Sequence, residues 1–128
     1  MFISSQVFCT THRSGDRPEK DTLANIRETS ECVVNMISED LVEAANCCCG
    51  EYPADVDEFL LSGLSKVPSE LPLNTPRVGE AKVQMECKVV ELKDLIGRAG
   101  KPSATMITCE IQRVHLHGSV HRQTANGS

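Results

Sequence analysis

Residues Lys20 to Met36, KDTLANIRETSECVVNM, decide the fold predicted for this chain. Asp21 and Thr22 are residue types that favour a helix N-cap. Leu23 and Ile26, three positions apart, place two apolar side chains on one helical face, and the residues around them are polar. The first half of the stretch therefore predicts a short amphipathic helix.

The second half of the stretch has the composition of a buried strand. From Cys32 to Ile37 the residues are apolar except for Asn35. An almost unbroken apolar run of this length is typical of a strand covered on both faces, and a single amide within it needs hydrogen-bond partners. The stretch thus predicts a helix that leads directly into a strand.

The turn into this helix has the properties of an anion site. The preceding loop, residues 12–19, is rich in turn-forming residues, and Arg13, Arg17 and Lys20 bring three positive charges towards the helix start. Unpaired N–H groups at a helix N-terminus, with a nearby cation and the Thr22 hydroxyl, can bind a phosphate. The alternative is that Thr22 only caps the helix and Lys20 is solvated.

The sequences of four segments resemble sequence motifs of the flavin reductase-like family. The resemblance covers roughly residues 13–117. Its segments, and the family patterns they match, are KDTLANIRETSECVVN (20–35) with KDTxxNIxxTxEFVVN, DEFLLSGL (57–64) with DEFxxAGL, PRVGEAKVQMECKV (76–89) with PRVxEAxxxxEC, and CEIQRVHLH (109–117) with GEVxxVHV.

The resemblance implies an α+β fold that is mainly β, an FMN-binding split barrel with short peripheral helices. We expect residues 1–117 to form this domain and residues 118–128 to be a disordered tail. Members of the family carry strands before the segment that matches residues 2–11, and more chain after the last one, so the barrel expected here is partial. Exposed edges of such a barrel favour a homodimer or pairing with a complete homologue.

The resemblance also implies a function. Members pass hydride from NAD(P)H to a flavin, so the chain is expected to be an FMN-binding oxidoreductase with flavin and nicotinamide nucleotides as partners. The alternative is a non-catalytic remnant that binds flavin weakly or serves as a partner subunit. The cofactor-binding positions that carry over are Lys20, Thr22, Thr10, Thr11, Arg13 and Asn35. His115 is the candidate catalytic residue.

The remaining sequence predicts short helices and long strands. Residues 2–11 predict a first strand, Ser38 opens a second helix, and a third from Asp55 is expected to turn Phe59, Leu60 and Leu64 inward. Three prolines between residues 67 and 77 predict an extended surface crossing.

Two further strands follow this crossing. In residues 83–89, Gln84, Glu86 and Lys88 alternate with apolar residues, which predicts a strand with one solvated face. After a Gly-rich connection, residues 106–116 predict another strand, with a bulge near Gln112 and Arg113.

Composition limits the classes of function. A net charge of −5 without a lysine or arginine cluster argues against nucleic-acid binding. No apolar run is long enough for a signal peptide or a membrane span, so we expect a cytoplasmic protein. The seven cysteines, three of them consecutive at 47–49, are expected to be free thiols, and His115 with His117 is a weak metal pattern that we set aside.

Overall fold

A computed structural model describes the backbone of residues 5–11, 19–50 and 52–120, with side chains from residue 19 onward. The chain divides into two compact units. Unit 1 comprises residues 1–32 and 87–112, and unit 2 comprises residues 33–86 and 113–128. None of the described helices is both long and apolar enough to cross a membrane.

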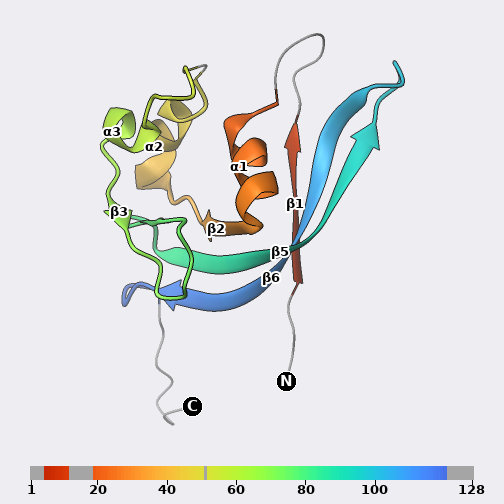
Figure 1. Cartoon of the computed structure of the whole chain (residues 1–128). Coiled ribbons are helices and arrows are strands. Elements are labelled where there is room, and N and C mark those ends of the chain that lie inside the picture. The colour runs from red at the N-terminus through yellow and green to blue at the C-terminus, as the bar shows by residue number, and fades with distance from the viewer. Residues whose placement is uncertain (1–4, 12–18, 51, 121–128) are drawn as a thin grey trace. The chain divides into compact units, whose positions relative to one another are not determined.

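A four-stranded sheet is the largest element of the fold (Figure 1). Its order is β1-β6-β5-β2, so β1 and β2 form its edges. Strand β1 pairs antiparallel with β6, from Ser5 opposite Glu110 to Thr11 opposite Ala104. The bounds of the strands are β1 (Ser5–Thr11), β2 (Glu31–Asn35), β5 (Val83–Ile96) and β6 (Pro102–Leu116).

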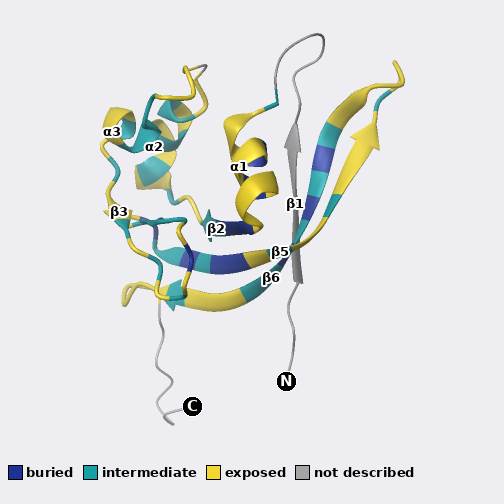
Figure 2. Cartoon of the chain, viewed as in Figure 1, coloured by how far each residue is buried: buried dark blue, intermediate teal, exposed yellow. Residues whose placement is uncertain are grey.

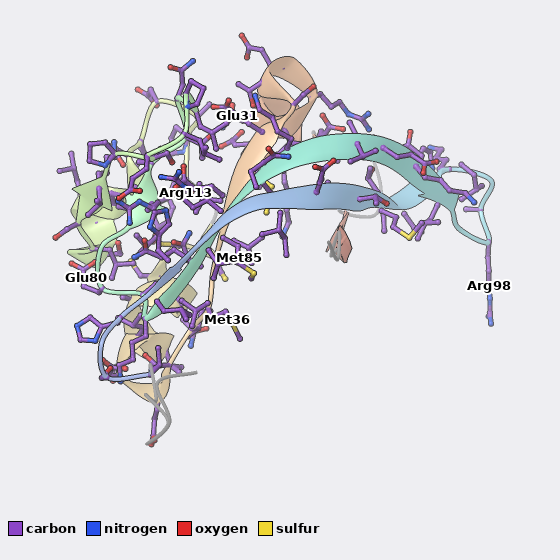
Figure 3. The ribbon with its side chains drawn as sticks, turned by 90° about the horizontal axis from the view of Figure 1, so that it is seen from below. Glu31, Met36, Glu80, Met85, Arg98 and Arg113 are labelled. Atoms are coloured by element: carbon purple, nitrogen blue, oxygen red, sulfur yellow. The ribbon has the colours of Figure 1, made fainter. Side chains whose placement is uncertain are left out.

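The connection between β5 and β6 is the predicted Gly-rich turn. The amide of Gly97 donates to the carbonyl of Lys101 over 2.9 Å, and that of Gly100 donates to the carbonyl of Gly97. Gly100 has φ of 72°, a value that a side chain would disfavour. Figure 3 shows Arg98 at this tip, pointing away from the strands.

Helix α1 (Asp21–Thr29) lies in unit 1 and confirms the predicted amphipathic helix. Leu23 and Ile26 are buried, with 1% and 4% of their surface exposed. The helix ends at Ser30, which adopts a left-handed conformation and donates its amide to the carbonyl of Ile26. The Ser30 carbonyl then accepts from the amide of Val89 on β5, so the end of the helix is attached to the sheet.

The core of unit 1 combines aliphatic side chains with three thiols. Figure 2 marks buried positions on α1, β2, β5 and β6 in dark blue. Cys87, Cys109 and Ile107 are fully buried, and Cys32 is nearly so. The Sγ atoms of Cys32 and Cys109 lie 3.5 Å apart. A hydrogen bond with Cys87, together with burial, raises the pKa of the Cys32 thiol, and burial raises that of Cys109. Cys32 and Cys109 therefore stay protonated and behave as small apolar side chains.

Unit 2 contains the short helices and a two-stranded sheet. Strands β3 and β4 pair antiparallel at the two ends of the segment for which only a crossing was predicted. Asp57 caps α3 by accepting the amide of Phe59, and Gly63 ends it with φ of 74°. The bounds are η1 (Glu39–Leu41), α2 (Val42–Cys47), α3 (Glu58–Ser62), β3 (Lys66–Val67) and β4 (Arg77–Val78).

Several local predictions in unit 2 were wrong. Strand β2 ends at Asn35, and Met36 and Ile37 are 54% and 62% exposed. Leu60 is 83% exposed because α3 has fewer than two turns, too few to turn three apolar residues to one face. Nothing in the described structure tests the bulge predicted near residues 112 and 113.

The predicted solvated face of β5 was also wrong. Gln84 and Glu86 are buried, with 6% and 0% of their surface exposed. The segment from Pro68 to Ala81 supplies their hydrogen-bond partners, so these polar side chains lie beneath it. Lys88 on the same face is exposed as predicted, and Cys87 on the opposite face is buried, so the prediction failed only at Gln84 and Glu86.

Candidate functional site

The N-terminus of α1 is the predicted phosphate site, and it is exposed. Lys20 occupies the N-cap position without a side-chain capping bond, so the prediction that Asp21 or Thr22 caps the helix was wrong. The Lys20 carbonyl accepts from the amides of Leu23 and Ala24 at 3.0 and 3.1 Å. Within the described residues, the amides of Asp21 and Thr22 have no backbone partner. The Lys20 and Thr22 side chains are both exposed, so the site has free donors of the kind that an anion needs.

An ion-pair network fixes this helix in unit 1. Arg27 Nε lies 2.9 Å from Glu19, and Arg27 Nη2 lies 3.0 Å from Asp94 on β5. Thr105 on β6 donates to the same Asp94 oxygen over 2.8 Å. The bond to Glu19, followed by that to Asp94, raises the pKa of Arg27. Because Arg27 neutralises Glu19, that carboxylate opposes an anion at the helix start less than its position suggests.

The other predicted phosphate contacts are only partly described. Thr10 and Thr11 lie at the end of β1, opposite Thr105 and Ala104, and their side chains lie outside the described part of the structure. Arg13 falls outside the described residues altogether. Their assignment to the flavin site stays a prediction.

Asn35 lies in unit 2 at the end of β2, where both ends of its amide are occupied. Its oxygen accepts from the amide of Val78 at 3.0 Å, and its nitrogen donates to the carbonyl of Val33 at 3.3 Å. The side chain also borders an apolar pocket of about 210 Å³. The pocket is lined by Asn35, Met36, Ile37, Leu41, Ala45, Cys48, Leu64, Val78 and Ala81. Asn35 is thus a structural link between β2 and β4, and a ligand role stays a prediction.

His115 pairs with a buried carboxylate in unit 2. Its Nε2 contacts an oxygen of Glu86, and 17% of its side-chain surface is exposed. Glu86 also accepts from the amides of Leu71 at 3.0 Å and Glu70 at 3.3 Å. Burial alone would raise the pKa of Glu86, but the bonds from His115 and the two amides outweigh it and lower that pKa. The carboxylate therefore remains ionised although it is buried.

Arg113 extends this cluster to the surface. Arg113 Nη1 lies 2.5 Å from Glu70, whose amide binds Glu86. Figure 3 shows Arg113 on β6. The described residues contain no group of three or more side chains arranged to hold a metal ion.

Sequence reasoning missed Glu86 as a candidate site residue. It appeared to be one of several polar residues on a solvated strand face. The proline-rich crossing could have indicated that a buried acceptor lies nearby. A segment without regular strand pairing must find acceptors for its amides elsewhere. A lone carboxylate in a strand facing such a crossing is a suitable acceptor.

A family model described as "Flavin reductase like domain" matches residues 7–126. The chain belongs to the flavin reductase-like family. Its fold is accordingly an incomplete split barrel, mainly β with short helices, as the four matched segments predicted. The sheet order has two open edges, which agrees with a barrel that is not closed within the described residues.

Similar proteins support this membership. An uncharacterised protein of Halalkalibacterium halodurans is 35% identical over 95 residues, which is 74% of this chain and 45% of that protein. Among solved structures, nitrilotriacetate monooxygenase component B from Bacillus cereus has a TM-score of 0.83 at 27% identity, covering 93% of this chain and 57% of that one. The 2-nitrobenzoate 2-nitroreductase of Pseudomonas fluorescens has a TM-score of 0.73 at 26% identity, covering 91% and 51%. The chain spans about half the length of these relatives.

Proposed function

We propose that this chain is an FMN-binding oxidoreductase of the flavin reductase type, in which NAD(P)H supplies hydride to the flavin. The observation that carries the proposal is the exposed N-terminus of α1, with Lys20 beside it, inside the segment matched by the family model. The residues there fit a phosphate, because amide and hydroxyl donors and a positive charge lie on adjacent residues.

The flavin, when bound, supplies the capacity to accept hydride. The residues of this chain would bind and orient it. Lys20 and Thr22 would hold the phosphate, and Thr10, Thr11 and Arg13 would extend that contact. Asn35 borders the apolar pocket in unit 2, where its amide is held in one orientation by Val33 and Val78.

The binding test is a fluorescence titration of the chain with FMN. The double variant Lys20→Ala, Thr22→Ala should weaken FMN binding by about 2 to 4 kcal/mol, since each lost bond is to a charged group. This corresponds to a rise in Kd of roughly 30- to 700-fold. Riboflavin lacks the phosphate, so its affinity should not change.

An exposed lysine in another part of unit 1 provides a matched control. Lys101 is exposed in the β5–β6 turn, and only its backbone carbonyl has a structural role there. Lys101→Ala removes the same charge and should leave FMN affinity unchanged. Equal weakening of FMN and riboflavin by the double variant would contradict a phosphate site, because the loss would then not depend on the phosphate.

Turnover distinguishes the oxidoreductase from the non-catalytic alternative. The chain, loaded with FMN, should consume NADH or NADPH, as followed by the loss of nicotinamide absorbance. FMN binding without consumption of either nucleotide would support the weak flavin binder or partner subunit instead. Absence of FMN binding would contradict the oxidoreductase and the weak flavin binder, and would leave the partner subunit.

We further propose that the working form is a homodimer or a pair with a complete homologue. The support is that β1 and β2 are open edges of the sheet, and such edges favour pairing with another chain. Light scattering after size exclusion should give twice the mass of one chain. A monomer at all concentrations would contradict self-association.

A further inference from the structure

Three thiols meet in the core of unit 1, on three neighbouring strands. Cys32 lies on β2, Cys87 on β5 and Cys109 on β6, and β5 is the middle strand of the three. The Cys32 thiol shares a hydrogen bond with Cys87, and its Sγ atom lies 3.5 Å from that of Cys109. All three cysteines are free. Two thiols are therefore close enough to Cys32 to compete for a bond with it.

The register of the sheet decides which of the two can form a disulfide with Cys32. Two backbone hydrogen bonds join β2 to β5 on either side of Cys32; they run from the amide of Val89 to Ser30 and from the amide of Met36 to Val83. On each strand the bonded residues are six positions apart, so the pairing is regular and puts Cys32 directly opposite Cys87. Opposite residues in a hydrogen-bonded pair have Cα atoms roughly 5.5 Å apart. A disulfide needs about 4.4 to 6.8 Å, so this pair can be bridged without moving the strands.

Cys109 is held too far away to be the partner, although its sulfur touches that of Cys32. Strand β5 separates β2 from β6, so the backbones of Cys32 and Cys109 are roughly 9.5 Å apart, twice the usual spacing of neighbouring strands. A disulfide between them would need Cα atoms within about 7 Å, and the backbone would have to move. The geometry therefore favours Cys87 over Cys109.

Cys32 and Cys87 also occupy a particular place in the chain. The first segment of unit 1 ends at Cys32 and its second segment begins at Cys87, so residues 33–86 leave unit 1 after one thiol and return at the other. A bond between the two thiols would close residues 33–86 into a loop. Closing a loop of this length removes many conformations from the unfolded chain and so stabilises the folded one.

We propose that Cys32 and Cys87 form a redox-responsive clasp, which closes residues 33–86 into a loop when a small disulfide such as glutathione disulfide oxidises the two thiols. The Cys32 thiolate attacks one sulfur of the small disulfide and expels a thiolate. The Cys87 thiolate then attacks Cys32 Sγ in the mixed disulfide and expels the second thiolate. Two electrons pass to the small disulfide, and its two thiolates take up the protons that the protein thiols lose. The clasp belongs to the fold of the chain and does not depend on flavin binding.

Burial makes this oxidation depend on opening of an edge strand. Cys87 has none of its surface exposed and Cys32 has 8% exposed. A buried, protonated thiol is not a nucleophile, so the reaction needs an open state in which the thiols meet water. Strand β2 has five residues and forms an edge of the four-stranded sheet, so it can open while the other strands stay paired. Cys32, which moves with β2, therefore reacts first.

The first test is to map the disulfide after treatment with glutathione disulfide. It uses a background in which the more exposed thiols of α2 and the turn after it are removed by Cys47→Ser, Cys48→Ser and Cys49→Ser. Trypsin then places the three core thiols on separate peptides, residues 28–66, 83–88 and 99–113. Mass spectrometry without reduction should find peptide 28–66 joined to peptide 83–88. A link from 28–66 to 99–113, or no link between these peptides, would overturn the proposal.

Two variants in the same background are the matched controls. Cys109→Ala removes the sulfur that touches Cys32 and should leave the bond between Cys32 and Cys87 in place. Cys87→Ala should stop the reaction at a mixed disulfide of Cys32 with glutathione. Circular dichroism establishes that each variant is folded before treatment, and where one is not, the peptide map of the background decides alone. Loss of the link in folded Cys109→Ala would contradict a bond to Cys87.

The second test measures what the clasp does to the fold. Oxidation of the background protein should raise Tm by about 10 °C, and reduction with dithiothreitol should reverse the rise. Hydrogen exchange of the Met36 amide, which donates to Val83 on β5, should slow by about tenfold because opening of β2 is restrained. Cys87→Ala treated in the same way should show neither change. A disulfide that forms but alters neither Tm nor exchange would overturn its role as a clasp.

Discussion

The two units bury opposite kinds of side chain along the same pair of long strands. In unit 1 most of the buried side chains are apolar or thiol, with Thr105 and Glu31 as polar exceptions. Leu23, Ile107 and Cys109 pack there with almost no exposed surface. In unit 2 the most buried positions on β5 are Gln84 and Glu86. One strand therefore supports a packed core in one unit and a hydrogen-bonded core in the other.

The difference follows from what each part of β5 contacts. In unit 1 the partners are an amphipathic helix and neighbouring strands, whose own hydrogen bonds are already made. In unit 2 the partner is a proline-rich crossing whose amides and carbonyls need side-chain partners. Gln84 donates to the carbonyls of Val78 and Ala81, and Glu86 accepts from the crossing. Unit 1 should thus be sensitive to lost volume, and unit 2 to lost polar partners.

The largest expected effect is in unit 1, where Leu23→Ala tests the packed core. Leu23 is 1% exposed, and its truncation should lower the free energy of unfolding by about 4 kcal/mol through lost burial and the cavity left behind. Urea denaturation measures this loss. The matched control is Ala24→Gly on the exposed side of the helix, which should cost about 1 kcal/mol through helix propensity alone. Equal losses would contradict a core centred on Leu23.

A slightly smaller loss is expected in unit 2 from Glu86→Ala. The truncation leaves the amides of Glu70 and Leu71 and the ring of His115 without their acceptor, at a cost of about 3 kcal/mol. Glu80→Ala is the control, since Glu80 also accepts an amide, that of Ser65 at 2.9 Å, but is exposed to solvent. If the control is as destabilising as Glu86→Ala, burial of the acceptor is not what matters.

The acid dependence of stability should separate the two units further. The pKa of Glu86 lies below its ordinary value of 4.5, so its contribution is complete above about pH 4.5 and is lost as the pH falls through the lower, folded value. The difference in Tm between wild type and Glu86→Gln should therefore shrink on acidification. The difference in Tm between wild type and Leu23→Ala should not shrink in this way, because both of these proteins contain Glu86. A constant gap for Glu86→Gln from neutral pH to pH 2 would contradict a depressed pKa.

The contrast between units also explains which parts of the fold the sequence could predict. The helix containing Leu23 and Ile26 was predicted correctly, because a local period and tertiary burial agree there. The third helix was predicted from Asp55, but it begins after Asp57, whose side chain caps it. The four matched segments predicted the family, which local patterns alone would not have done.

The sequence was less informative wherever burial depends on a distant segment. Gln84 and Glu86 were placed in solvent because alternation does not reveal that residues 68–81 cover them. The sheet of β3 and β4 was missed because two residues on each strand are too few to show a period. For the candidate site, the exposed helix start was predicted and the Glu86–His115 pair was not, since its two residues are 29 positions apart in sequence.

The smallest expected effect concerns Leu60, a residue that the sequence placed in the core. It is 83% exposed on α3, so Leu60→Ser should change the free energy of unfolding by less than about 0.5 kcal/mol. Leu73, which is only 9% exposed within the crossing, is the matched comparison in unit 2, and Leu73→Ser should cost several times more. Urea denaturation of both variants measures the two effects. A large loss for Leu60→Ser would mean that this leucine is covered in solution, which an intermolecular contact through α3 would explain. Repeating the measurement at several protein concentrations distinguishes these cases, because only a contact between chains makes the loss depend on concentration.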